Sequence, residues 1–247
     1  AMTTLCMTID VEDFQEGMAV LGHEVPKGTG EEEGLRRLLE RLGALASGPK
    51  VTLFVVGRHA PALRSVLSEF AAAGHEIASH GPDHGRLPGR GLEDWLRSGR
   101  QGLEDLLGIP VLGFRSPRFD LPPGTDLAGY RSSLAAAGYR YVSDTASLGP
   151  GSPVRELPVL RWRGFPVGGG SYQRLLPAAV VSEAVRRNGG PAVCYYHSYD
   201  FDGTVPALRE VRTAAVAKQT LGRSRIAAVF ANLAERYGSR TCSHATE

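Results

Sequence analysis

Cysteine is scarce in this sequence: the chain of 247 residues contains only Cys6, Cys194 and Cys242. No pair of them has the C-x-x-C spacing of a thiolate metal site, and three cysteines are too few for a disulfide framework. Neither a disulfide-rich scaffold nor a cysteine-ligated metal is therefore indicated, and the composition fits a reducing compartment.

An excess of charge of either sign is absent as well. The 28 basic and 26 acidic residues leave a formal net charge of only +2. Lysine occurs only at Lys27, Lys50 and Lys218, and the arginines that supply the remaining positive charge are scattered among acidic residues. The basic stripe that would bind a polyanion is missing, so we expect no nucleic-acid partner.

Long apolar runs are also lacking. No stretch of about 18 apolar residues, the length that can cross a bilayer, occurs in the sequence. The first residues lack the basic and apolar regions of a secretion signal. We therefore expect a cytoplasmic protein without stable membrane insertion, acting on an intracellular substrate.

Short apolar runs alternate with amphipathic stretches, the pattern of successive βα units around a parallel sheet. The runs predict strands at Leu5–Ile9, Val51–Val56, His75–Ala78, Val111–Phe114, Tyr139–Ser143 and Ala192–Tyr196. The amphipathic stretches predict helices at Glu31–Ala46, Ala60–Ala73, Leu92–Leu107, Asp126–Ala137 and Ala178–Asn188. The segment Pro150–Gly170 breaks this rhythm and is expected to form a hairpin or excursion. No linker divides the chain, so we expect one α/β domain over residues 1–247, with a short tail from about 239.

His80 and His84 follow the third predicted strand at a spacing that suits two ligands of one metal ion. Pro82 between them disfavours a helix, so we expect a loop. Two imidazoles and one carboxylate leave open coordination positions on a divalent ion, which can then activate water or polarise a carbonyl. The pair therefore indicates a hydrolase. The alternatives are two surface histidines in a polar turn, or an iron oxygenase, whose usual double-stranded β-helix fold does not match the βα alternation.

An acidic cluster of Asp10, Glu12 and Asp13 closes the first predicted strand. Asp10 and Glu12 point the same way by the period-two rule, whereas Asp13 lies past the strand in a turn. One carboxylate can then bind the metal while another acts as a base. The alternative interpretation is an N-terminal cap on a following helix.

Further polar residues stand at the ends of later strands, where α/β barrels carry their chemistry. Arg115 could hold a catalytic carboxylate in its ionised state and fix its orientation. His197 suits a general acid that protonates a leaving amine, and Asp144 could raise its pKa by pairing with it. Alternatively, Arg115 is a surface cation, His197 is a structural histidine and Asp144 is a helix N-cap.

These motifs resemble the NodB-homology polysaccharide deacetylases of carbohydrate esterase family 4. The likeness runs from Thr8–Phe14 through His80–His84 and Arg115–Pro117 to Tyr195–His197. It is closest to the branch found with bacterial exopolysaccharide and exosortase loci, which is similar in its first motif and in the segment Gly168–Pro177.

The resemblance implies a distorted (β/α)7 barrel of the NodB type and a divalent metal ion, usually zinc. In that family pattern Asp10 would be the base, and His80, His84 and either Glu12 or Asp13 would hold the metal. The resemblance also implies that Arg115 orients Asp10 and that Asp144 tunes His197 as the acid. The backbone N–H of Arg118 or of a neighbouring residue would help the metal to stabilise the oxyanion. An insertion in the first motif leaves the choice between Glu12 and Asp13 open, although same-face geometry favours Glu12.

The function that follows is removal of an N-acetyl group from an amino sugar in a saccharide or glycosylated small molecule. One alternative is another C–N hydrolase on the same scaffold, acting on a formyl group or a cyclic amide. The other is an inert carbohydrate-binding relative, which would keep Trp162 and Tyr172 as groove aromatics but need no base.

Overall fold

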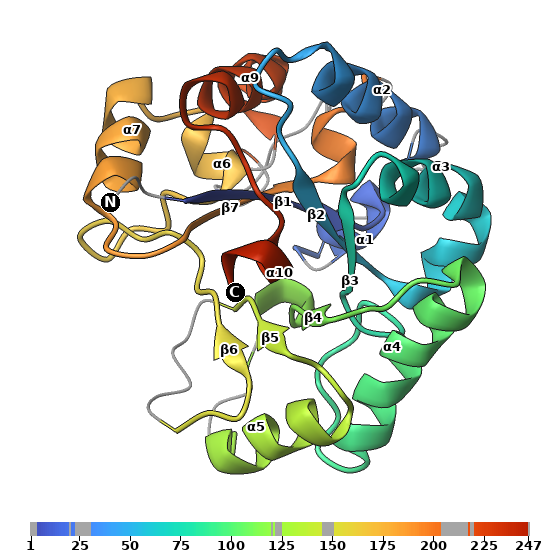
Figure 1. Ribbon diagram of the computed structural model, residues 1–247. Helices are drawn as coiled ribbons and strands as arrows, with labels where there is room; N and C mark the ends of the chain where they lie inside the picture. Colours follow the sequence, from blue (N-terminus) through green and yellow to red (C-terminus); the bar gives the residue numbers. More distant parts are fainter. Residues whose placement is uncertain are drawn as a thin grey trace.

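Seven parallel strands form one curled sheet in the order β6-β5-β4-β3-β2-β1-β7 (Figure 1). This computed structural model describes residues 4–19, 21–22, 31–119, 121, 125–144, 151–203, 217 and 220–246. The strands are β1 (Leu5–Val11), β2 (Val51–Val55), β3 (Glu76–Ser79), β4 (Gly113–Phe114), β5 (Tyr141–Val142), β6 (Arg155–Glu156) and β7 (Ala192–His197). Every residue of β1 and β2 is buried, as expected for central strands of a parallel sheet that is covered on both faces.

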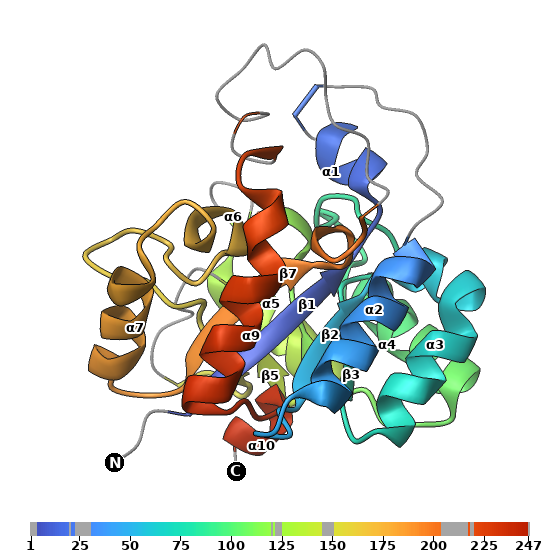
Figure 2. The ribbon, with the colours of Figure 1, turned by 90° about the horizontal axis from the view of Figure 1, so that it is seen from above.

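Helices surround the outer face of the sheet (Figures 1 and 2). The α-helices are α1 (Phe14–Ala19), α2 (Glu31–Ala44), α3 (Ala60–Ala72), α4 (Leu92–Leu107), α5 (Leu127–Ala136), α6 (Gly170–Gln173), α7 (Ala178–Arg187), α9 (Ile226–Tyr237) and α10 (Cys242–Ala245). The single 3-10 turns of the described residues are η1 (Gly57–His59), η2 (Pro117–Phe119), η3 (Ser198–Asp200) and η4 (Arg223–Arg225). None of the helices that the structure describes is long and apolar enough to cross a membrane.

All six predicted strands and all five predicted helices are present, with shorter ends in several places. The short helices α1, α6 and α10 and the longer α9 were not predicted. The predicted excursion at Pro150–Gly170 begins outside the described residues. Its described part supplies the edge strand β6, parallel to β5, and then a tight turn in which Trp162 and Phe165 form an antiparallel bridge.

The segment after α9, predicted as a tail, packs against the end of the sheet where the strands begin. The Ser239 hydroxyl accepts a hydrogen bond from the backbone of Met7 at 3.0 Å, and the backbone of Cys242 donates to the Thr52 hydroxyl at 2.8 Å. Cys242 is fully buried. Figure 2 shows α10 and α1 at opposite ends of the strands. The end of the sheet that this segment covers is therefore the one away from the carboxyl ends of the strands.

Candidate active site

The carboxyl ends of β1, β3, β4 and β7 converge on one pocket of about 170 Å³. Parallel pairing in register places Asp10 of β1 directly beside His197 of β7. The pocket is lined by Asp10, Glu12, Gly17, His80, His84, Arg118, Phe119, Ser171, Tyr195 and His197. The strand-end residues that the sequence singled out are thereby gathered into one cavity, apart from those described below.

Glu12, His80 and His84 form a cluster of donor atoms that lie within 4.8 Å of one another. The three residues are almost inaccessible to solvent, at 5%, 1% and 9% exposure. Glu12 Oε2 contacts His84 Nε2 and lies 4.0 Å from His80 Nε2. One carboxylate and two imidazoles of this kind form the open ligand set of a divalent ion.

The second nitrogen of His80 shows that its ring is oriented for this role. His80 Nδ1 lies 2.9 Å from the Arg115 carbonyl oxygen. A carbonyl oxygen can only accept a hydrogen bond, so Nδ1 is the nitrogen that carries the proton. That bond leaves the lone pair on Nε2 facing Glu12, the arrangement that metal-ligating histidines commonly adopt. The residues present therefore fit a bound divalent metal.

The charge of Glu12 is strongly stabilised by its neighbours. Burial raises its pKa, but the imidazoles of His84, His197 and His80 outweigh burial and lower the pKa to about 2. At His80, by contrast, burial dominates and lowers the pKa below the usual range. A metal cation binds an ionised carboxylate and a neutral imidazole. Glu12 and His80 therefore favour the protonation states that metal binding requires.

Asp10 is held by a fully buried guanidinium. Arg115 Nη1 donates to Asp10 Oδ1 at 2.6 Å and to the Thr8 hydroxyl at 2.8 Å, and the remaining donors bond Ser143. The Arg115 guanidinium also lies over the Phe54 ring, 4.0 Å from its centroid. Because so many contacts fix Arg115, one oxygen of Asp10 is held in place while the side chain lines the pocket.

His197 has a carboxylate partner that the sequence analysis missed, Asp200. Asp200 Oδ2 accepts a hydrogen bond from the backbone of His197 at 3.0 Å and lies 3.4 Å from its Nδ1. Burial lowers the pKa of His197, but Asp200 and Glu12 outweigh it and raise the pKa to about 9. The Tyr199 ring stacks on the imidazole with centroids 4.7 Å apart. The only available signal was an acidic residue three positions after the histidine.

The expected pairing of Asp144 with His197 is wrong. Asp144 Oδ1 accepts hydrogen bonds from the Ser116 backbone at 2.9 Å and hydroxyl at 2.7 Å, and Oδ2 accepts one from Tyr130 at 2.9 Å. Burial outweighs these bonds and raises the pKa of Asp144. Asp144 follows β5, and its side chain turns towards the neighbouring turn after β4 and towards α5, where Ser116 and Tyr130 hold both of its oxygens. Asp144 instead fixes the turn after β4.

Three other predicted residues lie outside the cluster. Asp13 accepts a hydrogen bond from the backbone of Gln15 at 2.8 Å and thus caps α1, so Glu12 is the carboxylate that stands with the histidines. Trp162 packs at the edge of the apolar core with Arg163 over its ring, and Tyr172 is half-buried on α6. Neither aromatic ring is part of the pocket lining.

Two family models match the chain, over ranges that overlap at residues 125–142. The model described as polysaccharide deacetylase matches residues 34–142, and a domain of unknown function, DUF3473, matches residues 125–247. His80, His84 and Arg115 fall in the first match and His197 and Asp200 in the second. The carboxylates of β1 precede both. No curated protein matches the chain.

Solved structures with the same fold cover nearly the whole chain. A Mycobacterium smegmatis protein assigned as a polysaccharide deacetylase has 22% identity and a TM-score of 0.61, covering 96% of this chain and 85% of its own. The peptidoglycan deacetylase PdaC from Bacillus subtilis has 12% identity and a TM-score of 0.54, covering 99% and 90%. A CE4-family pseudoenzyme from Bacillus anthracis has 15% identity and a TM-score of 0.53, covering 100% and 66%.

These similarities confirm the predicted fold. The curled sheet of seven parallel strands with surrounding helices is the (β/α)7 barrel of the NodB-type deacetylases in carbohydrate esterase family 4. The sequence match over residues 34–142 supports a deacetylase of this type. The pseudoenzyme shows that the fold also occurs without activity, so function must be argued from the site itself.

Proposed function

We propose that the protein is a metal-dependent hydrolase that removes the N-acetyl group of an amino sugar in a saccharide or glycosylated small molecule. The observation that carries the proposal is the meeting of three units in one pocket: the Glu12, His80 and His84 cluster, Asp10 held by Arg115, and His197 held by Asp200. Amide hydrolysis needs an electrophilic centre, a base and an acid, and these three units can supply them.

Glu12, His80 and His84 would hold the metal, and zinc is the ion that a site of two imidazoles and one carboxylate suits. When bound, the metal supplies Lewis-acid polarisation of the acetyl carbonyl and lowers the pKa of water in the site. Asp13 is engaged at the start of α1 and takes no part.

Asp10 takes the proton of the attacking water. Its Oδ1 is occupied by Arg115 at 2.6 Å, so the proton goes to the oxygen that Arg115 leaves available. Thr8 and Ser143 also accept hydrogen bonds from Arg115, and Asp10 therefore keeps one orientation through the reaction. A base fixed in this way needs no reorganisation when water attacks.

His197 donates a proton to the departing nitrogen, so that acetate and a free amine are released. Amine nitrogen leaves poorly unless it is protonated, and Asp200 favours the protonated imidazole that this step requires. Arg174, which is fully buried, lies 3.4 Å from Asp200 and holds it in turn. The pKa of Asp200 is lowered, because the hydrogen bond and charge of His197 and the charge of Arg174 outweigh burial.

Arg118, in the turn after β4, lines the pocket, and its backbone N–H would assist in stabilising the oxyanion. Contact of Trp162 or Tyr172 with a longer saccharide stays a prediction, as do membership of the exopolysaccharide-associated branch and a cytoplasmic location. The rival hydrolase, acting on a formyl group or a cyclic amide, would use the same acid and base. Acetate release separates the two.

The test is mass spectrometry of a panel of N-acetylated saccharides and glycosides after incubation with zinc-loaded protein. We expect loss of one acetyl group per reaction and an equal amount of acetate. Chelated protein and the variant Asp10→Asn serve as matched negative controls. If fully metal-loaded protein releases no acetate from any member of the panel, the proposal fails, and the inert-relative alternative takes its place.

A further inference from the structure

Arg118 stands out among the charged residues of the pocket because its guanidinium is exposed and serves no internal purpose. It lines the pocket together with Phe119, and no carboxylate in the described part of the chain forms an ion pair with it. Arg115, three residues earlier, is by contrast fully buried and bonded to Asp10, Thr8 and Ser143. A cation placed at a pocket and left unpaired is available to a ligand.

The backbone that carries Arg118 is strained. Arg118 has φ of 64° and Phe119 has φ of 53°, and both lie in the left-handed region that favours glycine. For residues with a side chain this conformation is sterically unfavourable. Such strain persists where the surrounding structure enforces it, and it concentrates at functional sites.

Several contacts enforce this turn. Asp144 holds the backbone and hydroxyl of Ser116, and the Phe119 backbone donates to the Ser116 carbonyl at 3.2 Å. The Phe119 ring packs edge-on against Tyr195, with centroids 4.8 Å apart. The backbone turn that carries Arg118 is thus held by a buried carboxylate and an aromatic contact.

The acidic residues of the pocket do not compete for Arg118. Asp10 is paired with Arg115, and Glu12 lies among His80, His84 and His197. An anionic group that enters the pocket can therefore bind the unpaired Arg118 guanidinium, and the pocket lining contains no unpaired carboxylate that would repel it. A neutral substrate would leave this charge without a partner.

We infer that Arg118 binds an anionic group of the substrate, so that the preferred substrate is an N-acetylated saccharide carrying a carboxylate or a phosphate close to the acetamido group. This inference rests on the proposed deacetylase function. Both anions present the paired oxygens that a guanidinium binds through two parallel hydrogen bonds.

The test compares three probes that share one disaccharide of N-acetylglucosamine: the neutral sugar, the same sugar with a lactyl ether carboxylate, and its 1-phosphate. For the zinc-loaded full chain, kcat/KM should be at least about fivefold higher for one or both anionic probes than for the neutral probe, as a charge-assisted hydrogen bond provides. The ratio should fall as salt is raised. Whichever anionic probe gains identifies the source of the charge.

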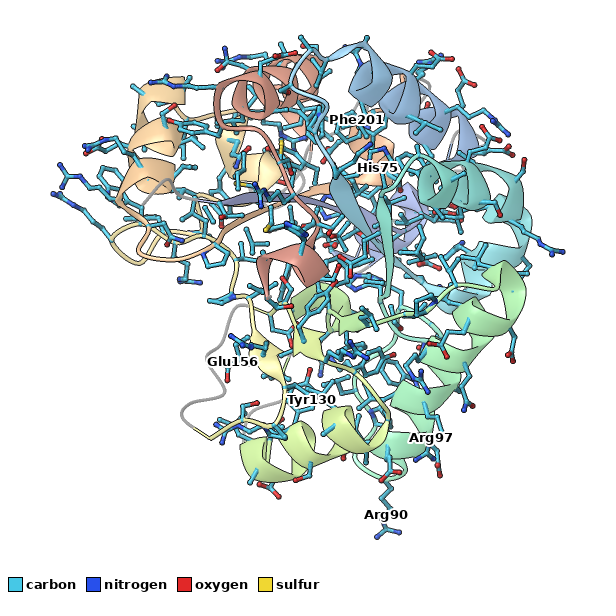
Figure 3. The ribbon with its side chains drawn as sticks, in the orientation of Figure 1. His75, Arg90, Arg97, Tyr130, Glu156 and Phe201 are labelled. Atoms are coloured by element: carbon cyan, nitrogen blue, oxygen red, sulfur yellow. The ribbon has the colours of Figure 1, made fainter. Side chains whose placement is uncertain are left out.

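Variants assign the preference to this side chain. Arg118→Gln should bring the anionic-to-neutral ratio close to one, and Arg118→Lys should restore part of it. Arg118→Asn repeats the test in a residue that tolerates the left-handed backbone, in case the glutamine variant does not fold. Arg90→Gln is the matched control, because Arg90 points away from the body of the protein and outside this pocket (Figure 3).

A wild-type ratio near one, or a ratio that survives in both Arg118→Gln and Arg118→Asn, overturns the inference while leaving the deacetylase proposal intact. Failure to deacetylate any of the three probes and any member of the wider panel counts against the proposed function instead.

Discussion

Arg115 and Asp10 form a salt bridge of 2.6 Å between β4 and β1, with side-chain exposures of 0% and 3%. The two residues are 105 positions apart in sequence, and two strands of the sheet lie between theirs. A buried charge is tolerated only when its partner and its hydrogen bonds are complete, and here Thr8 and Ser143 complete them. The pair therefore fixes the geometry of the pocket floor as well as the proposed base.

The role of Asp10 can be tested with Asp10→Asn, which keeps the shape of the side chain but cannot take a proton. We expect metal content to be unchanged and kcat for deacetylation to fall by at least about 10²-fold, the usual contribution of a general base. Metal analysis and steady-state kinetics on the same preparation give the answer. Loss of metal together with activity would make Asp10 a ligand and require the roles in the acidic cluster to be exchanged.

Metal binding should separate Glu12 from Asp13. We expect about one divalent ion per chain in the wild type, and its loss in His80→Ala, His84→Ala and Glu12→Gln. Asp13→Asn is the matched control and should keep the ion, because Asp13 caps α1 outside the cluster. Mass spectrometry under native conditions measures the occupancy. Full occupancy in a His80→Ala, His84→Ala double variant would rule out this site.

The proposed role of His197 as general acid can be tested by comparing an amide with an activated ester. The aryloxide of an aryl ester leaves without help from a proton donor, whereas an amine does not. His197→Ala should lower N-deacetylation by roughly 10² to 10⁴-fold while retaining much of the hydrolysis of an aryl acetate. Asp200→Asn should act in the same direction and more weakly, since it leaves the imidazole in place. Asp144→Asn is the comparison that decides between the two aspartates.

If Asp200 acts through His197, the double variant should be no worse on the amide than His197→Ala alone. Equal losses on amide and ester would instead show that His197 positions the substrate or stabilises the oxyanion. A selective loss on the amide in Asp144→Asn, without one in Asp200→Asn, would reverse the assignment of the partner.

His75 predicts a loss of stability in acid. His75 lies next to the start of β3, where its Nδ1 accepts a hydrogen bond from the Val51 backbone at 3.2 Å (Figure 3). Burial lowers its pKa from 6.5 to about 4. Because the folded protein binds this proton less readily than the unfolded chain, the free energy of unfolding is unaffected above pH 6.5 and falls as the pH drops from 6.5 towards 4.

Urea unfolding of the wild type and His75→Asn at a series of pH values measures this effect. The stability difference between the two proteins should narrow with acidification across that range. His244→Asn, at an exposed position on α10, is the control and should track the wild type. A constant difference between wild type and His75→Asn over the whole range would contradict the prediction.

Local patterns carried much of the fold and site. The alternation of apolar and amphipathic segments predicted the βα order, because burial of strands and of one helix face imposes a period that can be read along the chain. His80 and His84 were predictable together because both lie on one loop after one strand. The strand period likewise favoured Glu12 over Asp13, and the cap that Asp13 forms on α1 is a local interaction too.

Only the tertiary structure decided which distant residues meet. The sequence favoured Asp144 as the partner of His197, but in the folded protein Asp144 bonds Ser116 and Tyr130, and Asp200, three residues after His197, lies beside the imidazole instead. The left-handed turn at Arg118 could not be predicted from the sequence either, because the contacts that stabilise its strained backbone come from residues at β5, α5 and β7. Spacing along the chain is set by local geometry, whereas pairing across a sheet depends on strand order and register, which no single segment encodes.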